Sequence, residues 1–256
     1  MEINILGPFT AHDHGVSIVP SAAKPRQLLA LLALHADRVV TVSTLMQELW
    51  GESIPRSAAT TLQTYILQLR RKIAGALIHD TSRQAKDVLE TRHSAYVLHV
   101  QPGTLDFVEF DQLVESGRHA TEAGDAHAAS RLYGQALDLW RGPALVDVRV
   151  GSALELEVLR LEERRMSTLE RRIEADLRIG RHAELIPELR VLAAQQPLHE
   201  NFCAQLMLAL HRAGNPWRAL EAYQRLRGSL VRELGLEPSP KLQRIQQAVL
   251  TGRPVG

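Results

Sequence analysis

The start of the chain combines short strand-like runs of apolar residues with helical spacing. "INILGPF" (residues 3–9) and "VSIVP" (16–20) are β-type runs, and the turn-rich "TAHDHG" separates them. A helix is predicted from about Pro25 through "RQLLALLALHA", because proline is favoured at the first helical position and the leucines then recur with helical spacing. Two strands followed by a helix are therefore expected.

Two more helices and a β-hairpin complete the pattern of the first hundred residues. A short helix is predicted at 43–49 with Ser43 as its N-cap, and "WGESIP" separates it from a third helix that Ser57 can cap. "DVLETRHSAYVLHV" predicts strands at 88–91 and 95–100 around a tight turn. The predicted order is β-β-α-α-α-hairpin, ending near "QPGTLD".

A three-helix core follows from this order, and we expect residues 1 to about 105 to fold alone around it. The positions predicted to be buried are Leu28, Leu31, Leu32, Leu45, Leu49, Leu62, Ile66 and Leu69.

The third helix, predicted at 57–73, has an outer face without acidic residues. Its apolar stripe must face a core and consists of Leu62, Ile66, Leu69 and Ile73. The opposite and flanking positions are Thr60, Gln63, Thr64, Leu67, Gln68, Arg70 and Arg71. No Asp or Glu occurs between Ser53 and His79, whereas a solvated helix usually mixes acids and bases.

After this region the pattern is helical only, and one turn recurs. Gly124, Gly180 and Gly214 open similar stretches, and the last two glycines are 34 residues apart, which is the tetratricopeptide period. The longer interval before Gly180 leaves room for an extra helix, predicted at 153–178. The second region is therefore predicted to be an all-α, tetratricopeptide-like helical domain.

The element order of the first region is that of a winged helix-turn-helix, whose third helix enters the DNA major groove. Gln63 and Gln68 can pair with adenine, arginine can bind guanine or phosphate, and the outward Leu67 can contact a thymine methyl. Arg92, at the hairpin tip, is placed for the minor groove or its phosphates. A chance acid-free surface helix is the alternative, and helix order, outer-face chemistry and hairpin together favour DNA.

Composition narrows the class of protein without deciding its partner. The chain of 256 residues suffices for two domains, and its net charge of +1 at pH 7 indicates no partner by itself. Cys203 is the single cysteine, which excludes a disulfide framework within the chain. There is no signal-peptide pattern and no run of about 18 apolar residues, so we expect a cytoplasmic protein without a membrane partner.

Enzyme classes find little support. No GxxxxGK[ST], GxGxxG, GxSxG or HExxH motif occurs. The histidines are scattered, and the carboxylates of 160–174 alternate with arginines as on a solvated, ion-paired helix. We therefore expect a protein without catalytic residues, metal or cofactor.

Four runs in the first region, "KPRQLLALLAL", "LMQELWG", "AATTLQTYILQLRRKI" and "TRHSAYVL", closely resemble the DNA-binding domain of the SARP regulators. These are pathway-specific activators of antibiotic gene clusters in actinomycetes. "ASRLYGQALDLWRGPAL" and the run from "HENFCAQLMLALHRAGNPWRALEAYQRLR" resemble their bacterial transcriptional activation domain. The resemblance covers nearly the whole chain and is greatest to the short members that regulate anthracycline-type aromatic polyketide pathways.

The resemblance implies an OmpR-like winged helix at 1–103 and a tetratricopeptide-like activation domain at 107–250. It also implies binding to direct repeats near promoter −35 elements and recruitment of RNA polymerase through its σ factor and α subunit. Homodimers or side-by-side protomers on DNA, and a nucleoid-associated location, are expected. Larger relatives append NTPase or phosphopeptide-binding domains, so neither form of control is expected here, and the lack of a receiver domain leaves no platform for aspartyl-phosphate switching.

Residue roles carry over by position. The expected DNA contacts, from residue chemistry and position together, are Arg56, Thr60, Gln63, Thr64, Leu67, Gln68, Arg70, Arg71, Arg92 and His93. The loop at 50–56 corresponds to the polymerase-facing loop of OmpR-type activators, and the expected polymerase contacts are Trp50, Gly51, Glu52 and Ser53.

Two other functions stay open at this point. A tetratricopeptide-type scaffold would dock a protein on the first domain, and a repressor would use the same DNA contacts without activating transcription. The operator, the pathway, any small-molecule ligand and the oligomeric state off DNA do not follow from the sequence.

Overall fold

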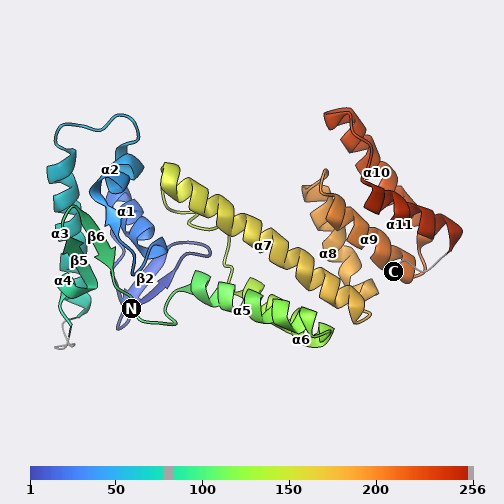
Figure 1. Ribbon diagram of the computed structural model, residues 1–256, viewed down its shortest axis with the longest axis horizontal. Helices are drawn as coiled ribbons and strands as arrows, with labels where there is room; N and C mark the ends of the chain where they lie inside the picture. The colour runs from blue at the N-terminus through green and yellow to red at the C-terminus, as the bar shows by residue number, and fades with distance from the viewer. Residues whose placement is uncertain (78–82, 253–256) are drawn as a thin grey trace. The chain divides into compact units, whose positions relative to one another are not determined.

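The structure, a computed structural model, describes residues 1–77 and 83–252. The chain forms two compact units (Figure 1). The first comprises Met1–Leu113 and Ala136–Met166, and the second comprises Val114–Gln135 and Ser167–Gly256. No described helix is long and apolar enough to cross a membrane.

A small antiparallel sheet opens the first unit, in the order β1 (Glu2–Asn4), β2 (Thr10–Asp13) and β3 (Val16–Ser17). Two strands with a turn at "TAHDHG" were expected, and that part of the prediction is wrong. Its first residues form β2, because fully buried Ala11 alternates with more polar neighbours as in a half-buried strand. The reversal is confined to His14 and Gly15, both with positive φ.

Three helices follow in the predicted order: α1 (Ala23–Leu34), α2 (Val42–Trp50) and α3 (Ala58–Ala76). Pro25 is the third residue of α1, whereas the sequence predicted it to be the first. All eight predicted core residues are buried, so the predicted three-helix core is confirmed. The prediction of Ser43 as N-cap is wrong, because Thr41 holds that position and its hydroxyl accepts a hydrogen bond from the Thr44 N–H at 3.2 Å. Ser57 does precede α3, but its side chain makes no capping bond.

The wing is the predicted hairpin, β5 (Leu89–Arg92) with β6 (Ala95–Leu98). The first strand is shifted one residue toward the C-terminus, since residue 88 ends a one-turn helix, α4 (Ala85–Val88), and the second strand ends two residues earlier than predicted. A two-residue strand, β4 (Val40–Thr41), adds to β6 and gives the antiparallel order β4-β6-β5. This short strand had no pattern of its own in the sequence, and it joins the start of α2 to the wing.

The first compact unit extends beyond the predicted domain boundary. The buried Asp106, at the start of α5 (Asp106–Glu122), accepts hydrogen bonds from the backbone N–H groups of Ile5 at 2.8 Å and Leu6 at 2.9 Å. Arg141 donates from its side chain to the Asp106 carboxylate at 2.9 Å and from its backbone to the Leu6 carbonyl at 2.8 Å. Because these bonds use Ile5 and Leu6, β1 ends at Asn4.

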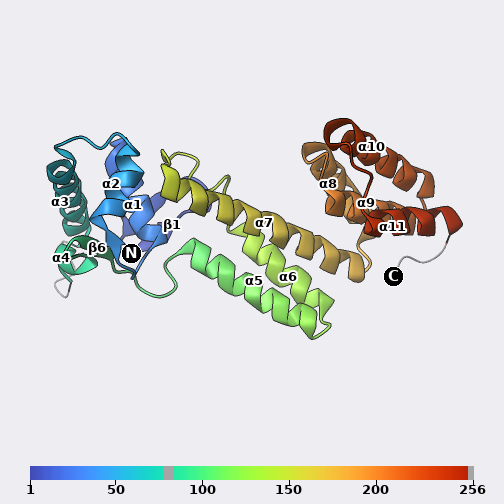
Figure 2. The same cartoon turned by 45° about the horizontal axis from the view of Figure 1, so that its top comes forward.

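The remaining helices are α6 (Ala126–Asp138), α7 (Ser152–Arg178), α8 (His182–Gln195), α9 (Glu200–Arg212), α10 (Pro216–Leu234) and α11 (Pro240–Thr251). The second unit takes most of α6, α7 from Ser167 onward and all of α8 to α11, and these helices give it its tetratricopeptide-like form. Consecutive helices α8, α9 and α10 pack as hairpins (Figure 2). The three predicted turn glycines all have positive φ, from 78° to 90°, which explains why glycine recurs there.

Candidate nucleic-acid interface

The outer face of α3 is open along its length. The expected DNA contacts that are exposed here are Arg56, Thr60, Gln63, Thr64, Leu67, Gln68 and Arg71. Leu67 is 48% exposed and is the apolar residue on this otherwise polar face. The Thr64 hydroxyl donates to the Thr60 carbonyl at 3.0 Å, so its oxygen remains an acceptor on this face. The helical spacing thus brings the six residues of α3 to one face, and Arg56 lies in the turn before the helix.

Arg70 differs from the other expected contacts because it is half-buried against the wing. Its Nε and Nη2 donate to the Leu89 carbonyl at 3.0 and 2.7 Å, and Nη2 also donates to the Thr91 hydroxyl at 2.7 Å. Three of its five N–H groups are therefore used inside the domain. Arg70 fixes β5 to α3, a role that sequence reasoning missed because Arg70 and Arg71 look equivalent in the sequence.

The wing tip places Arg92 and His93 at an exposed turn, with φ of 50° at His93. Arg92 donates through Nε to Glu90 at 3.0 Å, and Glu90 also pairs with His99 at 2.8 Å. Hydrogen bonds from Arg92 and then His99 lower the pKa of Glu90. The expected phosphate contact therefore carries a carboxylate beside it, and that carboxylate competes with phosphate for the guanidinium.

The loop expected to face polymerase begins at a fixed aromatic ring. Trp50 stacks on Tyr65 with centroids 6.4 Å apart, and the Lys24 ammonium lies 4.6 Å from its ring centre. Gly51 has a φ of 59° and ends α2. After it the chain is exposed through Glu52 and Ser53 to Ile54, which is 48% exposed and was not singled out from the sequence.

Glu48, buried in α2, joins the helix-turn-helix to the following region. Its carboxylate accepts hydrogen bonds from the backbone N–H groups of Gly151 at 2.6 Å, Ala153 at 2.9 Å and Leu154 at 3.1 Å, so it caps the start of α7. The Gln27 amide donates to the same carboxylate at 2.7 Å. A Cβ at Gly151 would lie 2.2 Å from the Glu48 carbonyl oxygen, which explains the glycine. The one signal in the sequence that could have predicted this role is the position of Glu48, three residues after Leu45 and therefore on the buried face of the helix.

Comparison with known proteins decides the family. Residues 18–94 match the model of the transcriptional regulatory protein C-terminal domain, and residues 105–250 match the bacterial transcriptional activator domain. The chain is 54% identical to the regulatory protein DnrI of Streptomyces peucetius over 254 residues, which cover 99% of this chain and 93% of DnrI. The chain belongs to the SARP family. The transcriptional regulator RedD of Streptomyces coelicolor is 36% identical, with 100% of this chain and 72% of RedD covered.

A solved structure supports the fold of this SARP regulator. Mycobacterium tuberculosis EmbR in complex with a low affinity phosphopeptide matches with a TM-score of 0.91 at 30% identity, covering 100% of this chain and 66% of that chain. The predicted class, an OmpR-like winged helix followed by a tetratricopeptide-like helical domain, is confirmed.

The family makes this protein a DNA-binding transcriptional regulator, and the prediction that it is not an enzyme is confirmed by its relatives and both domain matches. The matches assign no role to a single side chain. The individual DNA and polymerase contacts, and the domain boundaries at 103 and 107, therefore stay predictions.

Proposed function

We propose that this SARP regulator activates transcription of an antibiotic gene cluster by reading direct repeats near the promoter −35 element. The observation that carries the proposal is the outer face of α3, where Thr, Gln, Leu and Arg are exposed and carboxylates are missing. A carboxylate there would face phosphate repulsion, and an exposed leucine gains by contact with a thymine methyl. The similarity to DnrI and RedD supports the regulatory role.

The proposed contacts divide into base reading and phosphate binding. Gln63 and Gln68 present amides that can pair with adenine, and Arg71 can reach guanine or phosphate. Arg56, before α3, and Arg92 and His93, at the wing tip, bind the backbone on either side of the groove. Arg70 acts indirectly, because its bonds to β5 set the position of the wing relative to α3.

Direct repeats require protomers in the same orientation, one to each repeat, so we propose side-by-side binding on DNA. The loop Trp50–Ser53 would then face RNA polymerase and contact its σ factor and α subunit. The ring of Trp50 supports this role as a rigid base, held by Tyr65 and Lys24, while Glu52 and Ser53 are exposed. This activity places the protein at the nucleoid in the cytoplasm.

Two assays together test the proposal. A mobility shift of promoter DNA should be lost in Gln68→Ala/Arg71→Ala and kept in a control, Gln246→Ala/Arg232→Ala, on α11 and α10. Transcription by purified polymerase should rise with the wild-type protein. A protein that shifts no promoter DNA would favour the scaffold, and one that shifts DNA but lowers transcription would be a repressor.

A further inference from the structure

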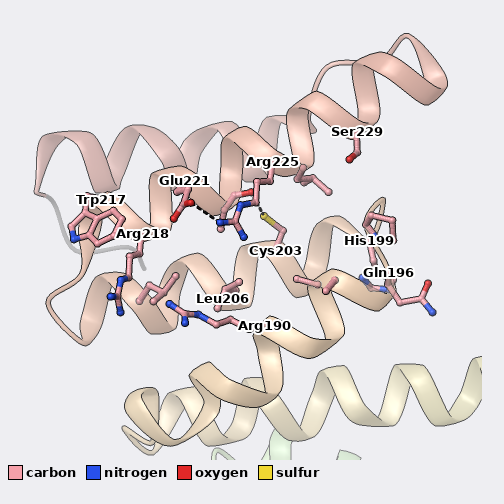
Figure 3. A pocket seen from close by; sticks show the side chains of 16 residues that line it. Arg190, Gln196, His199, Cys203, Leu206, Trp217, Arg218, Glu221, Arg225 and Ser229 are labelled. Atoms are coloured by element: carbon pink, nitrogen blue, oxygen red, sulfur yellow. Dashed lines mark hydrogen bonds and ion pairs between the residues drawn. The ribbon is translucent and has the colours of Figure 1, made fainter.

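A pocket of about 560 Å³ lies among α8, α9 and α10 of the second unit (Figure 3). Its apolar lining includes Ala193, Leu206, Leu210 and Leu226. Pockets of about 300 to 1,000 Å³ are the size that encloses small organic molecules. All of its lining residues belong to one compact unit, so the pocket is complete without another part of the chain.

The charges in the pocket are mostly positive. Arg190, Arg218 and Arg225 line it, and Glu221 is the one acidic side chain among the described lining residues. Glu221 pairs with Arg225 at 2.5 Å, which leaves two arginines without a carboxylate partner among the described residues. Figure 3 shows Arg190 and Arg218 extending toward the end of the pocket where Trp217 lies. The pocket thus favours an anionic group at that end.

Trp217 adds an aromatic surface at the same end. Its side chain is 62% exposed, which is unfavourable for a large ring in water, and the Arg218 guanidinium lies 5.0 Å from the ring centre. An aromatic ligand placed against Trp217 would regain apolar contact, and its acid group would reach the neighbouring guanidinium groups. Arginine forms paired hydrogen bonds to planar acids and stacks on rings, so both contacts suit one ligand.

Cys203 lines the pocket but is unsuited to covalent chemistry. It is buried, its thiol donates weakly to the Ala222 carbonyl at 3.6 Å, and burial raises its pKa to about 12. Because the reactive form is the thiolate, this cysteine is inert at neutral pH. The pocket therefore has the chemistry of reversible binding.

We propose that this pocket binds a small aromatic organic anion, with its rings against Trp217 and the leucines and its carboxylate or sulfonate between Arg190 and Arg218. This ligand site is separate from the DNA contacts of α3 and adds to the proposed function. A ligand stabilises the form of a protein that binds it, so the stability of the helical domain would rise with the concentration of this small molecule.

The test uses two dyes with the same rings. 1-Anilinonaphthalene-8-sulfonate carries an anion, and N-phenyl-1-naphthylamine lacks it. Fluorescence titration of the full chain should show one saturable site for the sulfonate, with binding about tenfold tighter than that of the neutral dye, as expected for one charge-assisted contact. Arg190→Gln should remove this selectivity, whereas Arg232→Gln, an exposed arginine of α10 outside the pocket, should keep it.

A second variant tests the location. Ala194→Trp should fill the pocket from its exposed wall and weaken both dyes, while a circular dichroism spectrum equal to that of the wild type confirms the fold. Equal affinity for the two dyes, or sulfonate binding unchanged in both Arg190→Gln and Ala194→Trp, would overturn the proposal. Displacement of the sulfonate by poly-L-glutamate but by no small aromatic acid would assign the face to a protein partner and overturn it as well.

Discussion

The outer face of α3 and the junction around Glu48 use their polar groups in opposite ways. On α3, Gln63, Gln68 and Arg71 are exposed and are bonded to no other residue in the described parts of the chain. At the junction, the buried carboxylate of Glu48 accepts three backbone N–H bonds and one from Gln27. A buried carboxylate must find its partners inside the protein, whereas the exposed side chains of α3 bind water and can exchange it for a partner such as DNA.

The junction should show the largest effect on stability. Glu48→Ala leaves the first N–H groups of α7 without their acceptor and should lower the free energy of unfolding by about 3 kcal/mol, since buried groups lose both partner and packing. Urea denaturation measures this. Glu52→Ala, which removes an exposed acid from the loop after the same helix, is the control and should change stability by less than about 0.5 kcal/mol. Equal losses of stability in the two variants would mean that the Glu48 carboxylate does not hold the start of α7 against α2.

Arg70 and Arg71 allow the same comparison within one helix, because Arg70 is bonded to the wing and Arg71 is exposed. Arg70→Ala removes three bonds to the wing and should lower the free energy of unfolding by about 1 to 2 kcal/mol. Arg71→Ala should leave stability unchanged and reduce the slope of log K against log salt by about 0.9, as one lost phosphate contact does. Urea denaturation measures the stability of both variants, and DNA binding at several salt concentrations measures their slopes. A salt slope unchanged in Arg71→Ala would remove it from the phosphate contacts.

Glu90 tests whether an internal partner restrains a DNA contact. Glu90→Gln removes the charge that pairs with Arg92, so DNA binding should become about two- to fivefold tighter, the effect of a surface ion pair. Arg92→Gln should bind more weakly than the wild type. If the double variant binds as tightly as Glu90→Gln alone, the gain does not come from Arg92, and the wing tip does not contact phosphate.

The smallest effect concerns pH. The hydrogen bond to Glu90, and after it the bond to Asp37, raises the pKa of His99. The cation near this group is Arg92, which pairs with the same Glu90. A raised pKa gives stability that is complete below the unfolded value of about 6.5 and is lost as pH rises through the folded value. The wild type should therefore lose a small amount of stability between about pH 5.5 and about pH 8.5 relative to His99→Asn. Denaturation midpoints of the two proteins at both pH values measure it, and parallel changes would contradict the linkage.

Periodicity predicted the parts of the fold that depend on nearby residues. Leu62, Ile66 and Leu69 recur with helical spacing, and burial of that stripe sets which face of α3 remains exposed. The candidate DNA surface follows from the same rule, since Gln63 and Gln68 must then point outward.

The features that periodicity did not predict depend on residues that are far apart in the sequence. β1 stops at Asn4 because Ile5 and Leu6 bind Asp106, about a hundred residues away in the sequence. Arg70 differs from Arg71 through its contact with Leu89. Such bonds have no local pattern, because they are set by which segments meet in three dimensions.

Base reading by α3 is the central claim, and site selection from random DNA tests it most directly. Wild-type protein and Gln68→Ala would each be used to select binding sites, with Gln246→Ala as control. We expect the wild type and the control to give the same sequence preference, and Gln68→Ala to lose discrimination at one A·T position, at a cost of about 1 to 3 kcal/mol on the best site. An unchanged preference in Gln68→Ala, with its fold intact, would show that this face of α3 does not read the bases.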